Sequence, residues 1–379
     1  MTDQVRVALI GANGHGRWHR RRIAELVQAG RVHLVGLADP QPIDPDPPIG
    51  DGVALFTDHR ELLATTAPDV VVICTPPHTH LPLALDALDA GCDLLLEKPP
   101  VASLAAHRTL AAQLNATGRA CQVGFQALGS QAWALFRAAV AGGPATGISA
   151  LASWQRDDAY YSRAPWAGRR AVGGRPVIDG SLVNPLAHAV MQALASASAA
   201  GAGRPRQLAV ERYRTRPIEV DDTAFARVTL DGGLRVTIAV TLAGEEFIPG
   251  QIDAVLPTGP ATLEYPTDRL ALPGDPSPLP VPGRADLLTN LLDHRDTGAP
   301  LLVPLELTRD FTAVLEALTE PDIPAPHLID DKYLDRAGQS RLIRGVNALV
   351  RQVAQTGSLP SELGVPWAAT PHIRRVPLG

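Results

Sequence analysis

Short apolar segments alternate with longer amphipathic ones over the first third of the chain. Six apolar runs have the length and composition of buried strands: Val5–Ile10, Val32–Ala38, Val53–Phe56, Val70–Ile73, Asp93–Leu96 and Ala120–Val123. Four segments between them have the length and polar periodicity of helices: Arg17–Ala29, Arg60–Thr65, Leu81–Asp89 and Leu104–Thr117. Strands that alternate with helices in this way predict a parallel sheet with helices on both faces.

After Phe125 the pattern changes to strand candidates joined by short turns, which is typical of an antiparallel sheet and predicts a second domain. One helix candidate, Gln131–Val140, precedes the strand candidates Gly147–Trp154, Gln207–Arg214, Ala224–Leu230 and Leu234–Leu242. Three further helix candidates follow: Ala285–Asp293, Leu305–Leu318 and Leu334–Ala354. In the last of these, apolar residues recur at helical spacing, so we expect one face of that helix to be buried.

Composition and charge narrow the class of protein. The 379 residues are 45% hydrophobic and 19% charged, an ordinary globular composition that supports two cores. The formal net charge of −5 argues against nucleic-acid and membrane partners, since both attract a basic surface. No apolar stretch is long enough to cross a bilayer, and the first residues lack the order of a signal peptide, so we expect a cytoplasmic protein. Cys74, Cys92 and Cys121 lack metal-ligand spacing and lie in or beside apolar runs, so we expect reduced thiols, no disulfide and no metal.

Lysine is rare in this chain, because only Lys98 and Lys332 are found among its 34 basic residues. Lys98 follows the strand candidate Asp93–Leu96, where a compact, titratable ammonium suits catalysis better than a guanidinium does. The alternative is that coding bias favours arginine and that two lysines remain by chance, as the ordinary setting of Lys332 indicates. The position of Lys98 in the fold has to decide between these interpretations.

A glycine turn, Gly11–Ala12–Asn13–Gly14–His15–Gly16, joins the first strand candidate to the first helix candidate. In this setting backbone amides and a helix N-terminus can hold a pyrophosphate, which predicts a dinucleotide site. Asn13 stands where the usual motif has its second glycine, and the glycine is displaced to Gly14. Asp39 ends the second strand, where a carboxylate accepts hydrogen bonds from the adenosine ribose and repels a 2′-phosphate. We therefore expect NAD, with NADP as the less favoured alternative because Arg17 could reach a 2′-phosphate.

Several separated motifs together resemble the Gfo/Idh/MocA oxidoreductases, the glucose-fructose oxidoreductase and inositol dehydrogenase group. They are the glycine turn, Ala38–Asp39, the run from Thr75 to His80, Glu97–Lys98–Pro99 and the run from Val123 to Gln126. The resemblance is strong over residues 5 to 126 and weaker through about residue 320. It implies an α/β protein with an N-terminal Rossmann doubly wound parallel sheet and a C-terminal α+β domain that carries an open, mostly antiparallel sheet.

The resemblance also implies a domain division and a set of cofactor contacts. Residues 1–126 would bind NAD(P), residues 127–328 would bind substrate and mediate homodimer or homotetramer contacts, and residues 329–379 would form a helix and tail of unassigned packing. The cofactor-binding residues that the resemblance and the turn together predict are Gly11, Asn13, Gly14, His15, Gly16, Asp39, Thr75, Pro76, Pro77, His80, Glu97, Lys98 and Gln126.

The family usually supplies Asp and His four residues apart in the second domain, and this chain departs from that pattern. Four residues beyond Asp179 stands Val183, whereas His188 is paired at that spacing with Asn184. We interpret the segment as shifted by a short insertion, with Asn184 in the position of the Asp. Pro185 then suits the first helical position and Asn184 the cap, so that His188 lies about one turn into the helix. The alternative is that Asn184 only caps the helix and that His188 is an ordinary core histidine.

These residues suit hydride transfer to or from a secondary alcohol. A neutral His188 can take the hydroxyl proton, and Lys98 can stabilise the alkoxide as hydride leaves. We therefore predict Lys98, His188 and Asn184 as catalytic residues, and these three with Arg156, Tyr160 and Trp166 as contacts to a polyol or sugar-like substrate. Two other activities stay open: redox-neutral glycoside cleavage or epimerisation with recycled NAD, and a dinucleotide- or sugar-sensing regulator without turnover.

Overall fold

The computed structural model describes residues 4–320 and 322–377, without the side chains of residues 175 and 176. The chain divides into two compact units. The first unit consists of Met1–Phe125 and Asp286–Thr308, and the second of Gln126–Ala285 and Arg309–Gly379. The predicted boundary near residue 126 agrees with this division. The predicted range 127–328 does not, because one internal segment returns to the first unit, and residues 329–379 belong to the second unit rather than standing apart.

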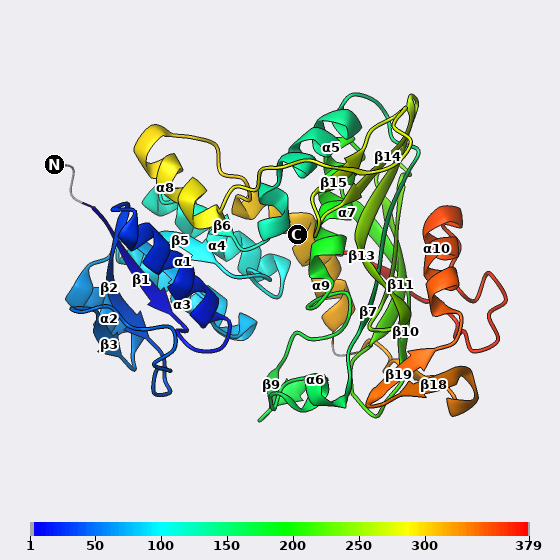
Figure 1. Cartoon of the computed structure of the whole chain (residues 1–379), viewed down its shortest axis with the longest axis horizontal. Helices are drawn as coiled ribbons and strands as arrows, with labels where there is room; N and C mark the ends of the chain where they lie inside the picture. The colour runs from blue at the N-terminus through cyan, green and yellow to red at the C-terminus, as the bar shows by residue number, and fades with distance from the viewer. Residues whose placement is uncertain (1–3, 321, 378–379) are drawn as a thin grey trace. The chain divides into compact units, whose positions relative to one another are not determined.

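The first unit contains a parallel sheet of six strands in the order β3-β2-β1-β4-β5-β6 (Figure 1). The strands are β1 (Val5–Ile10), β2 (Val32–Ala38), β3 (Ala54–Phe56), β4 (Val70–Ile73), β5 (Asp93–Leu96) and β6 (Cys121–Val123). The helices are α1 (Gly16–Gln28), α2 (His59–Thr66), α3 (His80–Asp89), α4 (Leu104–Thr117) and α8 (Leu287–Thr297). The predicted parallel sheet is therefore confirmed, with strand ends within one residue of those expected.

The strand order reverses at β1, which has β2 on one side and β4 on the other. In an open parallel sheet, ligands bind beyond the carboxyl ends of the strands at such a reversal. Because all six strands run the same way, the residues that follow them meet at one edge of the sheet. This edge therefore holds the glycine turn after β1, Asp39 after β2, Thr75 after β4 and Lys98 after β5.

The returning segment is tied to the first unit through the last strand of its sheet. The side chain of Gln122 in β6 is fully buried, donates to Asn290 Oδ1 at 2.6 Å and accepts from the Val303 amide at 2.8 Å. Arg295 forms an ion pair with Asp93 at the start of β5. The helix at residues 285–293 was expected, but its partners were not, because these contacts join residues far apart in the sequence.

The second unit is built on a ten-stranded, mostly antiparallel sheet in the order β16-β15-β14-β13-β7-β12-β11-β10-β17, with β20 also paired to β10. Its strands are β7 (Gly147–Gln155), β10 (Pro205–Arg214), β11 (Thr223–Leu230), β12 (Arg235–Thr241), β13 (Ala243–Leu256), β14 (Gly259–Glu264), β15 (Arg269–Ala271), β16 (Leu279–Pro280), β17 (His327–Leu328) and β20 (His372–Arg375). Smaller elements are α5 (Gln131–Ala141), α6 (Asp158–Ser162), β8 (Ala171–Val172), β9 (Arg175–Pro176), α7 (Ala187–Ala199), α9 (Arg309–Thr319), β18 (Leu334–Ala337), β19 (Ser340–Ile343) and α10 (Val346–Thr356). The predicted fold class is confirmed.

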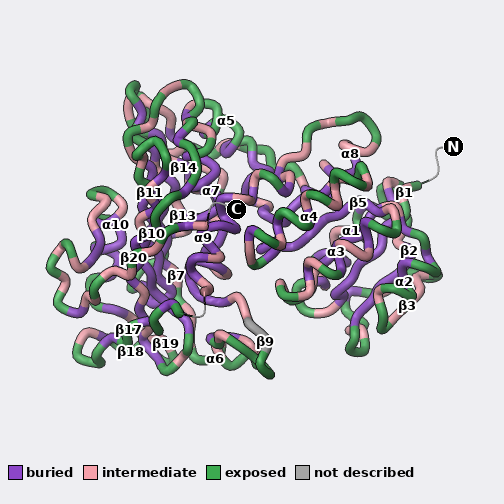
Figure 2. The backbone as a smooth tube through the Cα atoms, turned by 180° about the vertical axis from the view of Figure 1, so that it is seen from behind, coloured by how far each residue is buried: buried purple, intermediate pink, exposed green. Residues whose placement is uncertain are grey.

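Helices cover both faces of this sheet. Helix α7 packs against β7, β12 and β13 and is buried along most of its length. Helix α10 packs on the same three strands from the opposite side, as the two labels on either side of the sheet in Figure 1 show. In Figure 2 the central strands, coloured purple as buried, lie between α7 and α10. The core on the α10 side includes Tyr213, Phe225, Val350 and Trp367, so the C-terminal segment completes the domain rather than trailing from it.

The predicted helix over 334–354 is wrong in its first half. Residues Leu334–Ala337 and Ser340–Ile343 pair as an antiparallel hairpin, and α10 begins only at Val346. Gly338 and Gly345 adopt φ values of 60° and 74°, which suit turns and interrupt a helix. The apolar spacing from Val346 onward was correctly predicted, since that half of the segment packs on the sheet.

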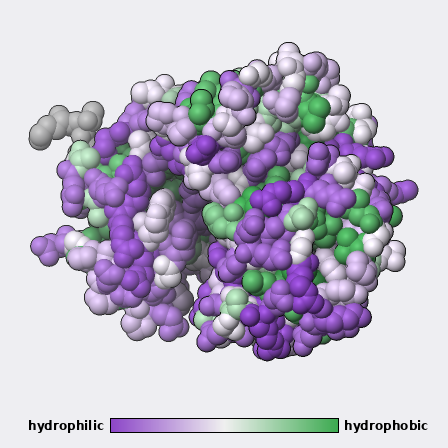
Figure 3. All heavy atoms as spheres, turned by 45° about the vertical axis from the view of Figure 1, so that its right-hand side comes forward, coloured by the Kyte–Doolittle hydropathy of each residue, from purple (hydrophilic) through white to green (hydrophobic). Residues whose placement is uncertain are grey.

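The surface shows no dominant apolar area on the face drawn in Figure 3, where hydrophobic residues form several separate groups among hydrophilic ones. In the described part of the chain, no helix combines the length and hydrophobicity needed to cross a membrane.

Trp367 provides a test of the role of the C-terminal segment. Its ring is 7% exposed and meets Tyr213 edge to face at a centroid distance of 4.9 Å. Trp367→Ala should lower the free energy of unfolding by about 3–5 kcal/mol in chemical denaturation, because it removes a large buried side chain. Ile373→Ala, at a residue 61% exposed on β20, is the control and should change little. Equal losses in the two variants would contradict a core role for Trp367.

Candidate functional site

The glycine turn after β1 is compact on one side and open on the other. A Cβ on Gly11 would collide with the carbonyl oxygen of Cys74, and one on Gly16 would collide with the carbonyl oxygen of Gly11. At Gly14, where φ is 55°, a Cβ would meet nothing within 4 Å. The amides of Gly14 and His15 donate no hydrogen bond within the described residues, and they stand at the start of α1. Free amides at a helix N-terminus with open space beside them fit a pyrophosphate.

Asn13 has a role that the sequence did not reveal. Its side-chain amide donates to the Pro42 carbonyl at 3.1 Å and accepts from the Asp44 amide at 2.9 Å. Its backbone amide donates to Asp39 Oδ2 at 3.1 Å. Asn13 thus ties the glycine turn to the loop after β2, which a glycine at this position could not do.

Asp39 is buried at the carboxyl end of β2, as predicted, and is oriented by backbone amides. Its two carboxylate oxygens accept from Asn13 and from the Gln41 amide, the latter at 3.0 Å. Arg17 is engaged elsewhere, since its guanidinium pairs with Asp44 at 3.1 Å and with Asp46 at 2.6 Å. The arginine near the turn is therefore held by the adjacent loop, and the carboxylate is the fixed charge at the end of β2.

Glu97, directly after β5, is a buried carboxylate with two histidine partners. Its Oε1 lies 2.9 Å from His19 Nε2 and 3.6 Å from His15 Nε2, and its Oε2 accepts from the Lys98 amide at 3.0 Å. Burial alone would raise the pKa of Glu97, but the interactions with the His15 and His19 rings outweigh it and hold the pKa well below its usual range. Glu97 is thus ionised, and it links the end of β5 to the first turns of α1.

His19 was not predicted as part of the site. The signal that would have found it is its spacing of four residues from His15, which places both rings on one side of α1. The ligand-type atoms of His15, His19 and Glu97 lie within 4.8 Å of one another, close enough to hold a metal ion. The hydrogen bonds already account for this grouping, and the absence of a metal stays a prediction.

His80 holds two loops together at the same edge of the sheet. Its ring is fully buried, with Nε2 2.8 Å from the Thr75 carbonyl and Nδ1 2.9 Å from the Pro99 carbonyl. Desolvation lowers its pKa. The ring thus joins the loops after β4 and β5, and the contact of His80 with the cofactor stays a prediction.

The remaining predicted cofactor residues lie near the strand ends. Thr75 follows β4, and its hydroxyl is 2.7 Å from that of Thr79 across the turn that contains Pro76 and Pro77. Lys98 is half-buried between Glu97 and Pro99. Gln126 is half-buried at the start of the second unit. The first unit therefore gathers Thr75, Glu97 and Lys98 at the edge that holds the glycine turn.

The predicted helix cap at Asn184 is wrong. Helix α7 begins at Ala187 and lacks a side-chain cap, and turns precede it. The Asn184 amide donates instead to Asp179 Oδ1 at 3.0 Å, while Asp179 Oδ2 accepts from the Gly168 amide at 2.7 Å. Asn184 was expected to replace an Asp, and the structure places a buried carboxylate directly against it.

His188 lies in the first turn of α7, as expected, although as its second residue. The ring is half-buried and lies 6.4 Å from that of Tyr265, which places it beside an aromatic side chain of the same unit. The positive end of the helix dipole favours a neutral imidazole there. Asn184 thus lies in the turns before α7, and His188 lies in the first turn of the helix.

The predicted substrate residues form a cluster on the segment after β7. The Arg156 guanidinium carbon is 5.0 Å from the Tyr160 ring centroid, and Arg163 lies 4.7 Å from that of Trp166. Asp157 caps the short helix α6 by accepting from the Tyr160 amide at 2.9 Å. The three predicted residues Arg156, Tyr160 and Trp166 are thus brought together, with Arg163 as a fourth member that was not predicted.

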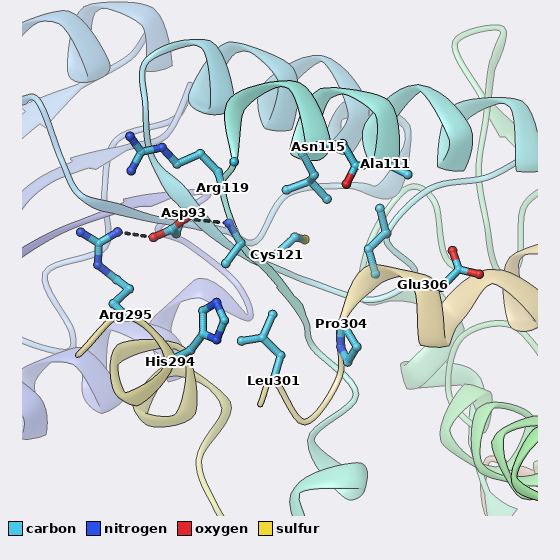
Figure 4. A pocket seen from close by; sticks show the side chains of 14 residues that line it. Asp93, Ala111, Asn115, Arg119, Cys121, His294, Arg295, Leu301, Pro304 and Glu306 are labelled. Atoms are coloured by element: carbon cyan, nitrogen blue, oxygen red, sulfur yellow. Dashed lines mark hydrogen bonds and ion pairs between the residues drawn. The ribbon is translucent and has the colours of Figure 1, made fainter. Parts of the chain in front are cut away.

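A pocket of about 750 Å³ in the first unit lies away from these residues (Figure 4). Its wall includes Asp93 and Cys121, the first residues of β5 and β6, together with Arg119, His294 and Arg295. The Asp93–Arg295 ion pair visible in Figure 4 closes one side. Because it is at the amino ends of the strands, this pocket is not the dinucleotide site.

The His15–Glu97 interaction predicts a pH-dependent contribution to stability. The interaction with the Glu97 carboxylate raises the pKa of His15 above 6.5, although desolvation opposes it. A raised folded-state pKa contributes stability that is fully present below pH 6.5 and is lost as pH rises through the folded value. The difference in unfolding free energy between the wild type and His15→Ala should therefore be largest below pH 6.5 and shrink above it. Exposed His33 supplies the control His33→Ala, and a pH-independent difference for His15 would contradict the assignment.

The first unit is similar in sequence to known proteins. Residues 5–125 match the Gfo/Idh/MocA family, described as an oxidoreductase family with an NAD-binding Rossmann fold. Inositol 2-dehydrogenase 4 of Saccharopolyspora erythraea is 32% identical over 123 residues, which cover 32% of this chain and 36% of the relative. The scyllo-inositol 2-dehydrogenase (NAD⁺) of Bacillus subtilis strain 168 is 30% identical over 127 residues, 33% of this chain and 36% of the relative. The matches thus span about a third of the length of these relatives.

Solved structures extend the likeness to both units. The WlbA dehydrogenase of Bordetella pertussis, solved with NADH and UDP-GlcNAcA, has a TM-score of 0.69 at 20% identity and covers 86% of this chain and 100% of that chain. UDP-N-acetylglucosamine 3-dehydrogenase GnnA of Acidithiobacillus ferrooxidans has a TM-score of 0.66 at 17% identity, over 84% of this chain and 99% of that chain. At these identities the likeness shows the fold alone. The match over residues 5–125 agrees with the predicted resemblance and with an NAD-binding Rossmann fold in the first unit.

Proposed function

We propose that the protein is an NAD-dependent dehydrogenase or reductase that moves hydride between the nicotinamide and a secondary alcohol or ketone of a sugar, cyclitol or glycoside. The observation that carries this proposal is the placement of Lys98 two residues after the end of β5, next to an ionised Glu97 and on the edge of the sheet that holds the glycine turn. The inositol dehydrogenases among the relatives support a polyol substrate.

The residues of the first unit fit NAD in two places. The amides of Gly14 and His15 would hold the pyrophosphate, and the Asp39 carboxylate would accept hydrogen bonds from the adenosine ribose hydroxyls. Bound NAD supplies the hydride acceptor, and the protein contributes orientation and charge.

Lys98 would act on the oxygen of the reacting carbon. Lys98 is half-buried, and its ammonium can donate a hydrogen bond to that oxygen and stabilise alkoxide character as hydride leaves. The backbone amide of Lys98 is held by Glu97, which limits the directions that the side chain can take. A lysine suits this task because its charge is compact and its proton can be released.

His188 and Asn184 would bind the substrate and handle its proton. A neutral imidazole at the start of α7 can accept the hydroxyl proton during oxidation. The hydrogen bond from Asn184 to Asp179 fixes the side-chain amide, and the carboxylate supplies near Asn184 the negative charge that an amide lacks. In this proposal Asp179 is a positioning residue, because it acts through Asn184.

Lys98→Ala tests the catalytic assignment. It should reduce turnover by about 10²–10⁴-fold and leave the Kd for NADH within about threefold, since the ammonium acts on the substrate oxygen. The chain offers one matched control, Lys332→Ala, because the only other lysine is exposed and pairs with Asp330. Loss of NADH binding by a normally folded Lys98→Ala protein would contradict a catalytic role.

The activity is measured as NADH absorbance with NAD and a panel of inositols, hexoses, sugar acids and glycosides, with product analysis of every mixture. A substrate-dependent rise that Lys98→Ala lacks is the expected result. Altered substrate without NADH accumulation would instead favour redox-neutral chemistry, and NAD binding without any reaction would favour a sensor.

Asp39→Asn tests the preference for NAD. The substitution keeps the shape of the side chain but removes its charge, so it should weaken NADH binding by about tenfold while NADPH binding stays equal or improves. Both values are obtained by fluorescence titration of the purified protein. A parallel loss of both affinities would mean that Asp39 serves mainly to hold the glycine turn.

A further inference from the structure

Aromatic residues and arginines are concentrated on the segment after β7. Four of the ten Trp and Tyr residues in the chain lie between positions 154 and 166: Trp154, Tyr160, Tyr161 and Trp166. Three arginines stack on them from the same unit. In a chain with 4% aromatic residues, such a concentration is typical of a binding surface.

Two of these arginines flank Tyr160. The guanidinium carbon of Arg156 lies 5.1 Å from the Trp154 ring centroid and 5.0 Å from that of Tyr160. The guanidinium carbon of Arg163 lies 3.5 Å from the Tyr160 centroid. Stacking of this kind holds a guanidinium in place while its N–H groups stay directed to the ring edges.

The charges of these two arginines are not balanced within the unit. Neighbouring arginines have carboxylate partners, since Arg216 pairs with Asp158 at 2.9 Å and Arg169 with Glu219 at 3.2 Å. Neither Arg156 nor Arg163 pairs with a carboxylate anywhere in residues 4–320 and 322–377; their partners are the backbone carbonyls of Gln155 and Tyr160 and, for Arg156, the Tyr160 side chain. The buried Nε of Arg156 has no hydrogen-bond partner among those residues. Two preorganised guanidiniums without counter-charge favour an anionic ligand.

The cluster adjoins the predicted substrate residues. Gly168, on the same segment, donates its amide to Asp179, and Asp179 accepts from Asn184 at 3.0 Å. The Tyr161 ring lies against the same glycine, since a Cβ built on Gly168 would be 3.3 Å from Tyr161 Cδ1. The unpaired arginines therefore lie beside the residues proposed to bind the reacting sugar.

We infer that Arg156 and Arg163 bind a negatively charged group, a carboxylate or a phosphate, carried by the sugar-type substrate. This inference rests on the proposed function and narrows its substrate class to acidic or phosphorylated sugars. The planar guanidinium can contact two oxygens of either group at once, and the aromatic rings around it provide surfaces for a sugar ring.

The test measures binding rather than turnover. The full-length protein is saturated with NADH and titrated by calorimetry with D-glucose, D-glucuronate, D-glucose 6-phosphate and UDP-glucuronate, which separate a ring carboxylate from a phosphate. At least one anionic sugar should bind about tenfold or more tightly than glucose, and Arg156→Gln and Arg163→Gln should each remove most of that difference. Arg169→Gln, an exposed arginine of the same segment with its own carboxylate partner, should keep it.

Equal binding of all four sugars, absence of binding by every one of them, or an equal loss in Arg169→Gln would overturn the inference. Circular dichroism and NADH affinity of each variant show whether the protein is folded and its first unit intact. The two proposals fail separately, because oxidation of neutral polyols with no preference for an anion would retain the dehydrogenase and exclude this arginine site.

Discussion

The buried carboxylate of Glu97 is the interaction on which the edge of the first sheet depends. It joins three segments: the end of β5, the first turns of α1 through His15 and His19, and the residue after β6. A Cβ on Gly124 would lie 2.9 Å from this carboxylate, so only glycine leaves room for it. Removing one partner of a buried ion pair typically costs about 3–5 kcal/mol. The same contact sets the backbone from which Lys98 projects, and it therefore connects the stability of the domain with its proposed chemistry.

The second unit uses a similar device near its candidate site. Asp179 is buried. It accepts one hydrogen bond from the backbone amide of Gly168 and another from the side-chain amide of Asn184. Asp221, close by in the fold, accepts from both the hydroxyl and the amide of Ser181. Desolvation raises the pKa of Asp221. The positive charge of Arg212 and the two hydrogen bonds from Ser181 oppose that increase. Buried carboxylates thus order the turns before α7, where a helix cap had been predicted instead.

The C-terminal segment covers part of the large sheet and so limits which surfaces of that sheet a second copy of the chain could contact. The large sheet is covered by α7 on one face and by α10 with the chain up to Trp367 on the other. A homo-oligomer was expected on the basis of family resemblance, with contacts through the second domain. Any such contact over β7 and β12 on the α10 side would meet the helix rather than the bare sheet.

The sequence by itself determined the parallel sheet, the glycine turn, Asp39 and the strand-end position of Lys98, because these follow from local periodicity and from residues adjacent to strands. Only the tertiary structure decided that His19 shares Glu97, that Asn184 pairs with Asp179 instead of capping a helix, and that 286–308 returns to the first unit. The hairpin at 334–343 belongs with these, since its apolar residues could equally line a helix face. The His19–Glu97 contact and the return of 286–308 join residues distant in sequence, and such contacts leave no periodic signal. At Asn184 and at 334–343 the partners are near in sequence, and there the hydrogen bonds of a buried carboxylate and the pairing of two short strands outweigh the local preference for a helix.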